Sequence, residues 1–309
     1  MVGIDNLNPY YDVSLKEARN AILEKQDGFT FIKGDLCDAE TVNEVFRKHG
    51  IKSVINLAAQ PGVRYSIENP QAYINANVIG FFNVLEASRH AKIEHMVFAS
   101  SSSVFGMNTN MPFSVHDNVD HPISLYAATK KSNELLAHSY SHLFRLPVTG
   151  LRYFTVYGPW GRPDMAPIKF CRAIQNGEPL TLYNHGDMER DFTYVGDIAA
   201  GTVAALEHIP EPNSSWSSDN PDPGSSTAPY RVYNIGAGRP VNLRRFLQLL
   251  EEAMGKKTEV RLAPMQPGDV KSTYADVEDL KRDVGYSPGI PLEEGIPEFV
   301  DWFLTFYKD

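Results

Sequence analysis

The feature that most constrains the fold is a repeated alternation between short apolar runs and longer stretches with helical spacing. Residues 53–59 (SVINLAA) and the start of 95–106 (HMVFASSSSVFG) are short and apolar, whereas 71–91 and 122–145 are long enough and periodic enough to predict helices. Alternating strands and helices are typical of βαβ units, in which parallel strands form a sheet with helices on both faces. The sequence therefore predicts an α/β fold with a doubly wound, Rossmann-like parallel sheet.

A change of pattern after residue 158 indicates a second, smaller C-terminal domain. Segment 159–191 is rich in glycine, proline and charged residues, 210–230 is a low-complexity loop, and the chain after a strand at 231–236 is mostly helical. The expected first domain comprises 1–154, with 192–209 and 231–236 returning to it, and the expected second domain comprises 155–191 and 237–309.

Charge and composition exclude several classes of function. The net charge is −9, which argues against nucleic acid or an anionic membrane as the main partner, since both attract basic proteins. No apolar run reaches the roughly 18 residues that a membrane span needs, and the N-terminus has no signal-peptide pattern. Two cysteines, Cys37 and Cys171, are too few for a disulfide framework. We therefore expect a cytoplasmic protein, and no pattern predicts a metal site.

Tyr126 and Lys130 in YAATK form the sharpest local pattern. Residues i and i+4 of a helix share a face, so the two side chains are expected side by side on the helix predicted over 122–145. A free tyrosine has a pKa near 10 and is a poor base at neutral pH, but a nearby ammonium lowers that pKa. Such a pair can take a proton from a sugar hydroxyl while hydride leaves the same carbon. The spacing also occurs by chance on solvent-facing helices, so the pair alone does not decide the function.

A serine run supports the catalytic interpretation. Ser100 to Ser103 follow the apolar MVFA, and ligands of a doubly wound sheet bind beyond the carboxyl ends of its strands. A hydroxyl at that place can hydrogen-bond the substrate oxygen on which a tyrosine acts. The alternative is a flexible serine-rich turn, which the buried strand before it disfavours.

Three segments, ASSSSVFG, YAATK and LRYFTVYGPWGRPDMA, resemble extended short-chain dehydrogenases/reductases in motif, order and spacing. The resemblance covers essentially the whole chain and is closest to UDP-glucuronate 4-epimerases, which have close counterparts of GIDNLNPYYD, NLAAQPGVRYS and YGPWGRPDMA. It implies an NAD-binding first domain, a nucleotide-sugar-binding second domain, a UDP-sugar substrate, and a homodimer formed through helices 71–91 and 122–145. It also implies Ser101, Tyr126 and Lys130 as the catalytic residues.

The resemblance implies one set of residues that bind NAD. Asp5 is expected to bind the adenosine ribose diol and to disfavour NADP, because a carboxylate accepts two ribose hydroxyls and repels a 2′-phosphate. Asp35 and Leu36 are expected near the adenine, and Asn77 is expected to support the cofactor side. The remaining implied cofactor residues are Asn6, Leu57, Ala58, Ala59, Ser100 and Tyr153, with Tyr126 and Lys130 serving both roles.

A second implied set binds the nucleotide sugar. Arg190 is expected to grip the diphosphate, since a guanidinium fork suits phosphate oxygens, and Asp269 is expected to hold the uridine ribose. Thr155 and Arg162 match positions that recognise the sugar carboxylate in glucuronate epimerases, with Ser102 as a third contact. The remaining implied substrate residues are Arg64, Ser103, Tyr183 and Gln266.

The same resemblance predicts a first strand and a Gly-x-x-Gly-x-x-Gly turn ahead of VGID at 2–5. The glycines of such a turn let the backbone approach the cofactor pyrophosphate at a helix N-terminus. The printed chain begins within the expected second strand, so we expect the first strand and the Gly-rich turn to be missing from it. In a strand order of 3-2-1-4-5-6 that first strand is central.

The favoured function is NAD-dependent epimerisation at C4, from UDP-glucuronate to UDP-galacturonate through a transient 4-keto sugar, with UDP-glucose or UDP-galactose as alternative substrates. A nucleotide-sugar dehydratase or decarboxylase is the second possibility. Those relatives carry acidic residues where this chain has Ser102 and Ser103, and the lack of an ionisable group favours oxidation and reduction alone. The third possibility is a truncated, inactive remnant that binds a nucleotide sugar without turnover.

Overall fold

A computed structural model describes residues 1–265 and 271–308, which fall into two compact units. Unit 1 comprises Met1–Asn110, Ser114–Tyr153 and Thr202–Asn234. Unit 2 comprises Met111–Phe113, Phe154–Gly201 and the chain from Ile235 on. The units are defined by their internal contacts. That one domain binds NAD and the other binds the nucleotide sugar therefore stays a prediction.

Unit 1 contains the parallel sheet that the alternating pattern predicts. Strands β3 (Ser53–Asn56), β4 (His95–Ser101), β5 (Val148–Tyr153) and β9 (Tyr230–Ile235) lie in the order β3-β4-β5-β9, and both the β3–β4 and β4–β5 ladders are parallel. The α/β fold class is therefore confirmed.

The first two strands form a separate sheet in unit 1. Strand β1 (Val2–Asp5) pairs in parallel with β2 (Thr30–Lys33), and among the described residues no ladder joins β1 to β3. Unit 1 thus contains a two-stranded parallel sheet beside the four-stranded sheet β3-β4-β5-β9.

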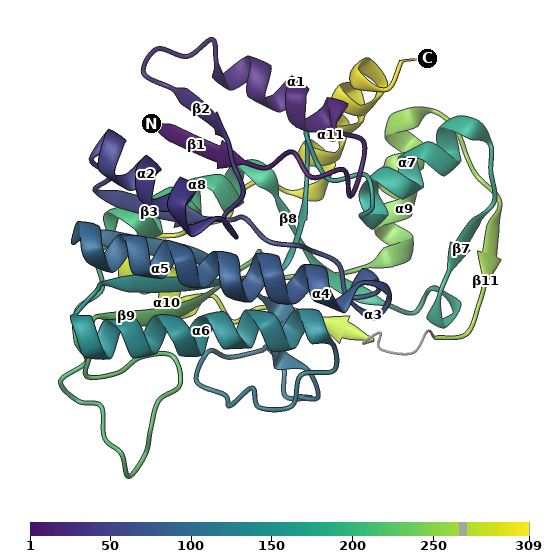
Figure 1. Ribbon diagram of the computed structural model, residues 1–309. Coiled ribbons are helices and arrows are strands. Elements are labelled where there is room, and N and C mark those ends of the chain that lie inside the picture. The colour runs from purple at the N-terminus through teal and green to yellow at the C-terminus, as the bar shows by residue number, and fades with distance from the viewer. Residues whose placement is uncertain (266–270, 309) are drawn as a thin grey trace. The chain divides into compact units, whose positions relative to one another are not determined.

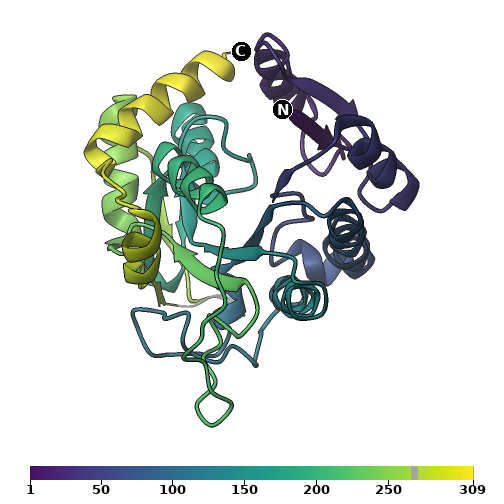
Figure 2. The same cartoon turned by 90° about the vertical axis from the view of Figure 1, so that its left-hand side faces the viewer.

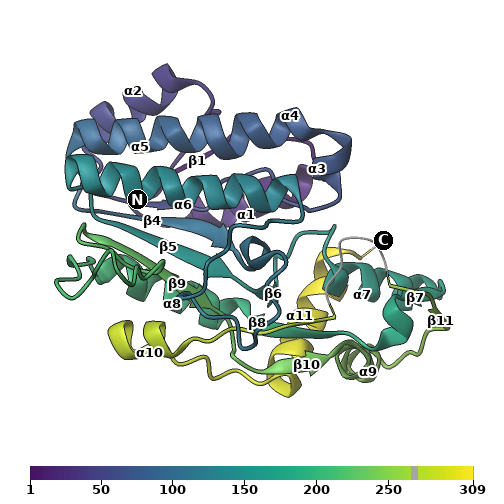
Figure 3. The ribbon, with the colours of Figure 1, turned by 90° about the horizontal axis from the view of Figure 1, so that it is seen from below.

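The helices of unit 1 begin with α1 (Ser14–Leu23) and α2 (Ala39–His49) and continue with one long helical run. That run, expected over 71–91, consists of α4 (Pro70–Tyr73), a π-helical segment η1 (Ile74–Ile79) and α5 (Gly80–Ala91), and the short α3 (Tyr65–Glu68) precedes it. Helix α6 (Leu125–Phe144) runs beside α5 (Figures 1 and 3).

The core of unit 1 forms where α5 and α6 pack on the central strands. Leu85 of α5, Met96 and Phe98 of β4, and Val148 of β5 are all fully buried in one apolar cluster. Burial of such side chains is the main favourable term in folding. The central strands therefore give a rigid base to the residues that follow β4.

Unit 2 is built around β8 (Glu189–Tyr194). Strands β10 (Pro240–Asn242) and β12 (Ser272–Thr273) flank β8, which also pairs with β6 (Thr155–Tyr157), and β7 (Leu180–Leu182) pairs with β11 (Val260–Leu262). Phe192 of β8 stacks on Phe246 with ring centroids 4.0 Å apart, at the centre of the unit's apolar core. The helices of this unit are α7 (Ala166–Asn176), α9 (Leu243–Met254), α10 (Glu278–Val284) and α11 (Leu292–Phe306), and α11 lies against α9 (Figure 2).

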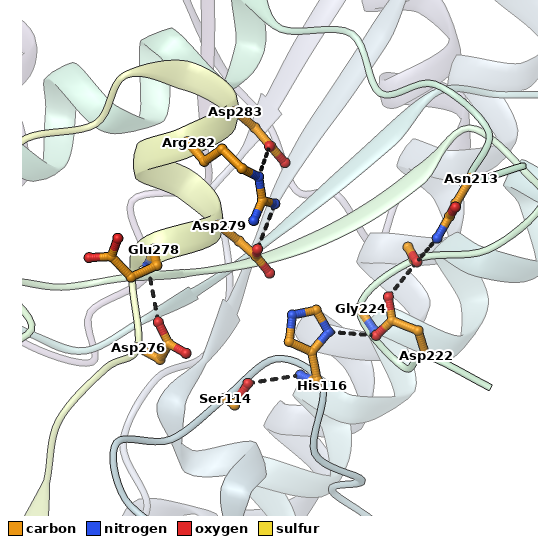
Figure 4. A network of polar contacts seen from close by, with 11 residues as sticks. Ser114, His116, Asn213, Asp222, Gly224, Asp276, Glu278, Asp279, Arg282 and Asp283 are labelled. Carbon is orange, nitrogen blue, oxygen red and sulfur yellow. Dashed lines mark hydrogen bonds and ion pairs between the residues drawn. The ribbon is translucent and has the colours of Figure 1, made fainter. Parts of the chain in front are cut away.

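The low-complexity segment 210–230 in unit 1 is fixed by hydrogen bonds although it contains no helix. His116 Nδ1 donates to Asp222 Oδ1 at 2.8 Å, and Asp222 also accepts from the backbone N–H of Gly224 at 3.0 Å (Figure 4). Helix α8 (Val195–Glu207), which begins in unit 2 and ends in unit 1, precedes this segment. No helix in the described part of the chain is long and apolar enough to cross a membrane.

Candidate active site

The carboxyl end of β4 places the serine run. Residues 95–98 are fully buried, and the strand ends at Ser101, whose side chain is 8% exposed. Ser101 Oγ accepts a hydrogen bond from the backbone N–H of Ser103 at 3.2 Å, so it caps the short 3-10 helix η2 (Ser102–Phe105). The cap fixes the Ser101 hydroxyl at the end of a central strand, where a doubly wound sheet binds its ligands.

Helix α6 presents Tyr126 and Lys130 on one face. Ser124 is its N-cap and accepts from the backbone N–H of Ala127 at 3.1 Å, which sets the start of the helix and puts Tyr126 in its first turn. Tyr126 is partly buried, and its ring meets that of Tyr73 edge-on with centroids 6.2 Å apart. Lys130 follows one turn later on the same face.

The ammonium of Lys130 is buried and tied to the strand that carries Ser101. The side chain is 3% exposed, and Nζ donates to the carbonyl of Ala99 on β4 at 2.7 Å. Burial disfavours the charged form and lowers the pKa of Lys130 to about 8. The lysine is thus still mostly charged at neutral pH and close to the range in which it can exchange a proton. Tyr126, Lys130 and Ser101 are anchored on two elements in direct contact.

Asn77 connects the helical run to α6 and to the end of β3. Asn77 Oδ1 accepts from the backbone N–H of Gln60 at 2.7 Å, and its Nδ2 donates to Thr129 Oγ1 at 3.0 Å. Asn133 Nδ2 in turn donates to the Asn77 carbonyl at 2.6 Å, within the π-helical segment that widens the helix here. This buried network fixes the segment after β3, including Leu57, Ala58 and Ala59, relative to the face of Tyr126.

The predicted adenosine residues lie together where β1 and β2 end. Asn6 Nδ2 donates to Asp35 Oδ2 at 3.0 Å, and Asp35 Oδ1 accepts from the backbone N–H of Cys37 at 2.8 Å. Burial alone would raise the pKa of Asp35, but these hydrogen bonds outweigh it and hold the pKa below its usual value. Asp5 forms an ion pair with Lys16 at 3.2 Å, and its side chain is still 47% exposed. Asp35 is therefore available as an ionised acceptor, and the exposed part of the Asp5 side chain is open to a ligand.

These residues fit NAD. The exposed carboxylate of Asp5, at the end of β1, matches a ribose diol, which offers two hydroxyl donors. Leu57, 56% exposed, offers apolar surface beyond the end of β3. Leu36 is anchored by Asn83, whose Nδ2 donates to the Leu36 carbonyl at 2.8 Å. The hydroxyls of two predicted cofactor residues already have protein partners: Ser100 Oγ donates to Glu134 Oε1 at 2.6 Å, and Tyr153 OH lies 2.9 Å from Thr202 Oγ1.

The predicted substrate residues of unit 2 lie on or beside its strands. Thr155 is on β6 opposite Phe192 of β8. Arg162 is 29% exposed and pairs with Asp164 at 3.1 Å. Arg190 on β8 donates through Nη1 to the carbonyls of Glu189 at 2.7 Å and Lys271 at 3.2 Å, and Tyr183 precedes the short helix η3 (Asn184–Gly186).

The other predicted substrate residues fall in three places. Ser102 and Ser103 are the first residues of η2 in unit 1 and are partly buried. Arg64 is exposed at the start of α3, also in unit 1. Gln266 and Asp269 lie outside the described residues.

Sequence reasoning missed the buried charges behind the serine run. Glu134 of α6 and Arg152 of β5 are 1% and 0% exposed, and Arg152 pairs with Glu134 through Nε at 2.9 Å and Nη2 at 3.0 Å. The sequence does contain a sign of this pair, because Glu134 follows Lys130 by one helical turn and Arg152 interrupts an apolar strand. No cluster of metal-binding side chains occurs in the residues that the structure describes.

Comparisons with known proteins agree with this geometry. Residues 2–236 match the NAD dependent epimerase/dehydratase family. Protein CapI of Staphylococcus aureus is 54% identical over 308 residues, covering 100% of this chain and 92% of that protein. A probable UDP-glucuronate 4-epimerase of Rhizobium meliloti (strain 1021) is 45% identical over 310 residues, covering 100% and 91%.

A solved structure gives the same match at the level of the fold. UDP-glucuronic acid 4-epimerase from Bacillus cereus, in complex with UDP-glucuronic acid and NAD, has a TM-score of 0.84 at 32% identity. The similarity covers 99% of this chain and 91% of that one.

Proposed function

Because this chain belongs to the NAD dependent epimerase/dehydratase family, we propose that it interconverts UDP-glucuronate and UDP-galacturonate by inverting C4 of the sugar. The observation that carries the proposal is the buried Lys130 ammonium one turn from Tyr126, bonded to the strand that ends at Ser101. The relatives named UDP-glucuronate 4-epimerase and the Bacillus cereus complex support the choice of sugar and cofactor.

Tyr126 acts as the general base in the proposed mechanism. It takes the proton of the 4-hydroxyl, and the positive charge of Lys130 stabilises the phenolate that this role requires. Ser101 donates a hydrogen bond to the same sugar oxygen and stabilises charge as the ketone forms. NAD⁺, when bound, supplies the hydride acceptor for C4 and later the hydride donor. The 4-keto sugar rotates in the site so that its opposite face receives the hydride. Tyr126 returns the proton to the oxygen, and the configuration at C4 is inverted.

Residues of unit 2 are proposed to hold the nucleotide and the sugar carboxylate. Arg190 is proposed to bind the diphosphate, because a guanidinium group matches the geometry of phosphate oxygens. Arg162 is proposed, with Thr155, to bind the carboxylate in exchange for its contact with Asp164. The 4-keto form of glucuronate is a β-keto acid, which loses CO₂ when its C–C bond aligns with the ketone π system. A fixed carboxylate prevents that alignment.

Dehydration and decarboxylation are the less favoured reactions. Ser102 and Ser103 occupy the turn after Ser101 and contribute no ionisable side chain. A dehydratase needs an acid there to expel a hydroxyl and a base to enolise. The polar but non-ionisable turn favours oxidation and reduction without elimination.

Product analysis by NMR tests the proposed function. The full chain, incubated with UDP-glucuronate and NAD⁺, is expected to yield UDP-galacturonate, and Tyr126→Phe is expected to lower kcat by about 10²- to 10⁴-fold. Arg162→Ala is expected to give a UDP-pentose side product or to abolish turnover of the acid. A UDP-pentose as the sole product of the unaltered protein would instead identify a decarboxylase, and an unchanged rate in Tyr126→Phe would contradict the assigned base.

A homodimer is part of the proposal. Apolar side chains lie exposed on η1, α5 and α6, namely Ile79 at 44%, Phe82 at 43%, Leu135 at 59% and Leu143 at 68%. Apolar area of this kind on neighbouring helices marks a protein interface. Light scattering of Leu135→Glu/Leu143→Glu is expected to give a monomer where the unaltered protein gives a dimer. We also propose a cytoplasmic location, because Cys37 and Cys171 are both free thiols.

A further inference from the structure

The buried pair of Glu134 and Arg152 connects α6 and β4, from which the catalytic residues project, with the neighbouring strand β5. Glu134 Oε1 accepts from Ser100 Oγ at 2.6 Å and from Arg152 Nε at 2.9 Å, while Oε2 accepts from Arg152 Nη2 at 3.0 Å. Ser100 and Arg152 lie opposite each other in the β4–β5 ladder. A single carboxylate on α6 therefore bonds to two neighbouring central strands at one level of the sheet.

The hydrogen bonds of Glu134 to Ser100 and Arg152 lie next to the proposed catalytic residues in the sequence of β4 and α6. Ser100 lies between Ala99, whose carbonyl accepts from Lys130, and Ser101. Glu134 follows Lys130 by one helical turn, so both side chains leave the same face of α6. The spacing between α6 and β4, which sets the position of Tyr126 relative to Ser101, is thus fixed at two successive turns of the helix.

Arg152 also holds the turn after Ser101. Its guanidinium carbon lies 4.9 Å from the centroid of the Phe105 ring, at the end of η2. Nη1 of Arg152 is buried and has no hydrogen-bond partner among the described residues. The guanidinium thus uses two nitrogens on Glu134 and its face on Phe105.

The burial of these charges makes stability a poor explanation for them. Glu134 and Arg152 are at most 1% exposed, and Ser100, which bonds to Glu134, is 2% exposed. Burial alone would raise the pKa of Glu134, but the charge and hydrogen bonds of Arg152 outweigh it and keep the pKa below its usual value, so the pair is ionised. Desolvating two charges costs several kcal/mol per ion, and well-packed apolar residues of similar volume are often equally or more stabilising. What an apolar pair lacks is the fixed direction of three short hydrogen bonds.

We propose that Glu134 and Arg152 are positioning residues for the reaction, which hold α6, β4 and η2 in the register that aligns Tyr126, Lys130 and Ser101. The inference rests on the proposed epimerase function. The pair touches neither substrate nor cofactor in this role. It acts through Ser100, Phe105 and the backbone of β4.

The test compares an apolar pair, Glu134→Leu/Arg152→Met, with the unaltered full chain. A second variant, Glu134→Asp, keeps the charge but shortens the side chain so that it cannot reach both strands. The matched control is Glu293→Asp, in an exposed ion pair with Arg245 at 3.0 Å in unit 2. Three experiments are made on each variant. They measure the thermal midpoint, the amide hydrogen exchange over 98–106 and over α2, and the kinetic constants kcat and KM for UDP-glucuronate.

We expect the apolar pair to unfold within about 5 °C of the unaltered chain, with exchange over 98–106 at least tenfold faster and exchange over α2 unchanged. A displacement of reacting groups by about 1 Å can cost 10²-fold, so kcat is expected to fall by about 30- to 100-fold while KM stays within about threefold. Glu134→Asp follows the same pattern with smaller changes, and the control changes nothing. If the apolar pair does not fold, the same criteria are applied to Glu134→Asp.

Three results would overturn the proposal. The first is unchanged exchange over 98–106 in a folded variant. The second is equally faster exchange over α2, which means general destabilisation, and the third is an activity loss in KM with kcat unchanged. If the unaltered chain forms no UDP-galacturonate, the proposed function fails, whereas the exchange comparison in the ligand-free protein still decides whether the pair fixes β4 and η2.

Discussion

Two buried acids, one in each unit, are satisfied in different ways. Glu134 in unit 1 is 1% exposed and takes its hydrogen bonds from side chains, chiefly Arg152 and Ser100. Asp191 in unit 2 is 0% exposed and accepts from the backbone N–H groups of Ala237 at 2.7 Å, Gly238 at 2.9 Å and Ala275 at 3.0 Å. The first acid joins a helix to two strands, and the second joins β8 to two loop segments.

This difference decides whether a second substitution can recover the stability that is lost when the acid is removed. The partners of Glu134 are side chains, so the whole polar pair can be exchanged for an apolar one. The three shortest hydrogen bonds of Asp191 come from main-chain groups that no substitution removes, and the Thr193 hydroxyl adds a longer one at 3.4 Å. Gly236 contributes to this tight packing, because a Cβ there would lie 2.8 Å from Asp191 Oδ2. Successive residues of a strand point to opposite faces, so fixing Asp191 also directs its neighbour Arg190 away from it.

Asp191→Ala is expected to have the largest effect on stability. It leaves three buried N–H donors without an acceptor, at about 1 to 3 kcal/mol each. The free energy of unfolding is therefore expected to fall by about 3 to 9 kcal/mol, with no second-site substitution at a main-chain partner to recover it. Urea unfolding measures the loss, and a loss below about 1 kcal/mol would show that the amides find other acceptors.

Glu134→Ala is expected to have the second-largest effect on stability, because it leaves the Arg152 charge buried without its carboxylate partner. Removing one member of a buried pair typically costs about 3 to 5 kcal/mol. Adding an apolar partner, as in Glu134→Leu/Arg152→Met, is expected to recover most of that free energy in the same urea experiment. If the double variant is as unstable as the single one, the contrast between side-chain and backbone partners is wrong.

His95 extends the comparison to a buried group that is neutral. It is 1% exposed at the start of β4, with Nδ1 2.8 Å from the Leu206 carbonyl and Nε2 2.9 Å from Thr149 Oγ1. Burial lowers the pKa of His95 below its ordinary 6.5, and the hydrogen bond to Leu206 offsets only part of that effect. Between the folded and unfolded pKa values the unfolded state binds more protons, so stability is full above pH 6.5 and falls as the pH drops below it.

The expected pH effect is smaller than the loss from either acid. His95→Gln is expected to flatten the part of the stability curve just below pH 6.5, measured by urea unfolding at several pH values. An equal slope in the variant would assign that pH dependence to other groups.

The smallest effect is expected at an exposed ion pair. Arg245 and Glu293 lie 3.0 Å apart with side chains 43% and 58% exposed. Solvent screens such pairs, so Glu293→Gln is expected to cost less than about 0.5 kcal/mol. A loss of stability as large as that of Glu134→Ala would show that burial does not explain the difference between the two ion pairs.

The parts of the fold that depend on local pattern were predictable. Alternating strands and helices gave the parallel sheet, and the i, i+4 spacing put Tyr126 and Lys130 on one face. The π-helical segment at 74–79 was not predicted, since its sequence continues an ordinary helical pattern. The link between Glu134 and Arg152 was not predictable either. It requires the register that places Ser100 opposite Arg152, and register is set by the sheet as a whole.

The most direct test of the central claim follows the hydrogen at C4. UDP-glucuronate carrying deuterium at C4 is incubated in ordinary water with the full chain and NAD⁺, and the product is examined by NMR and mass spectrometry. Hydride removal and return predict UDP-galacturonate that keeps its deuterium at C4. Product with solvent hydrogen at C4, or no UDP-galacturonate at all, would contradict the account.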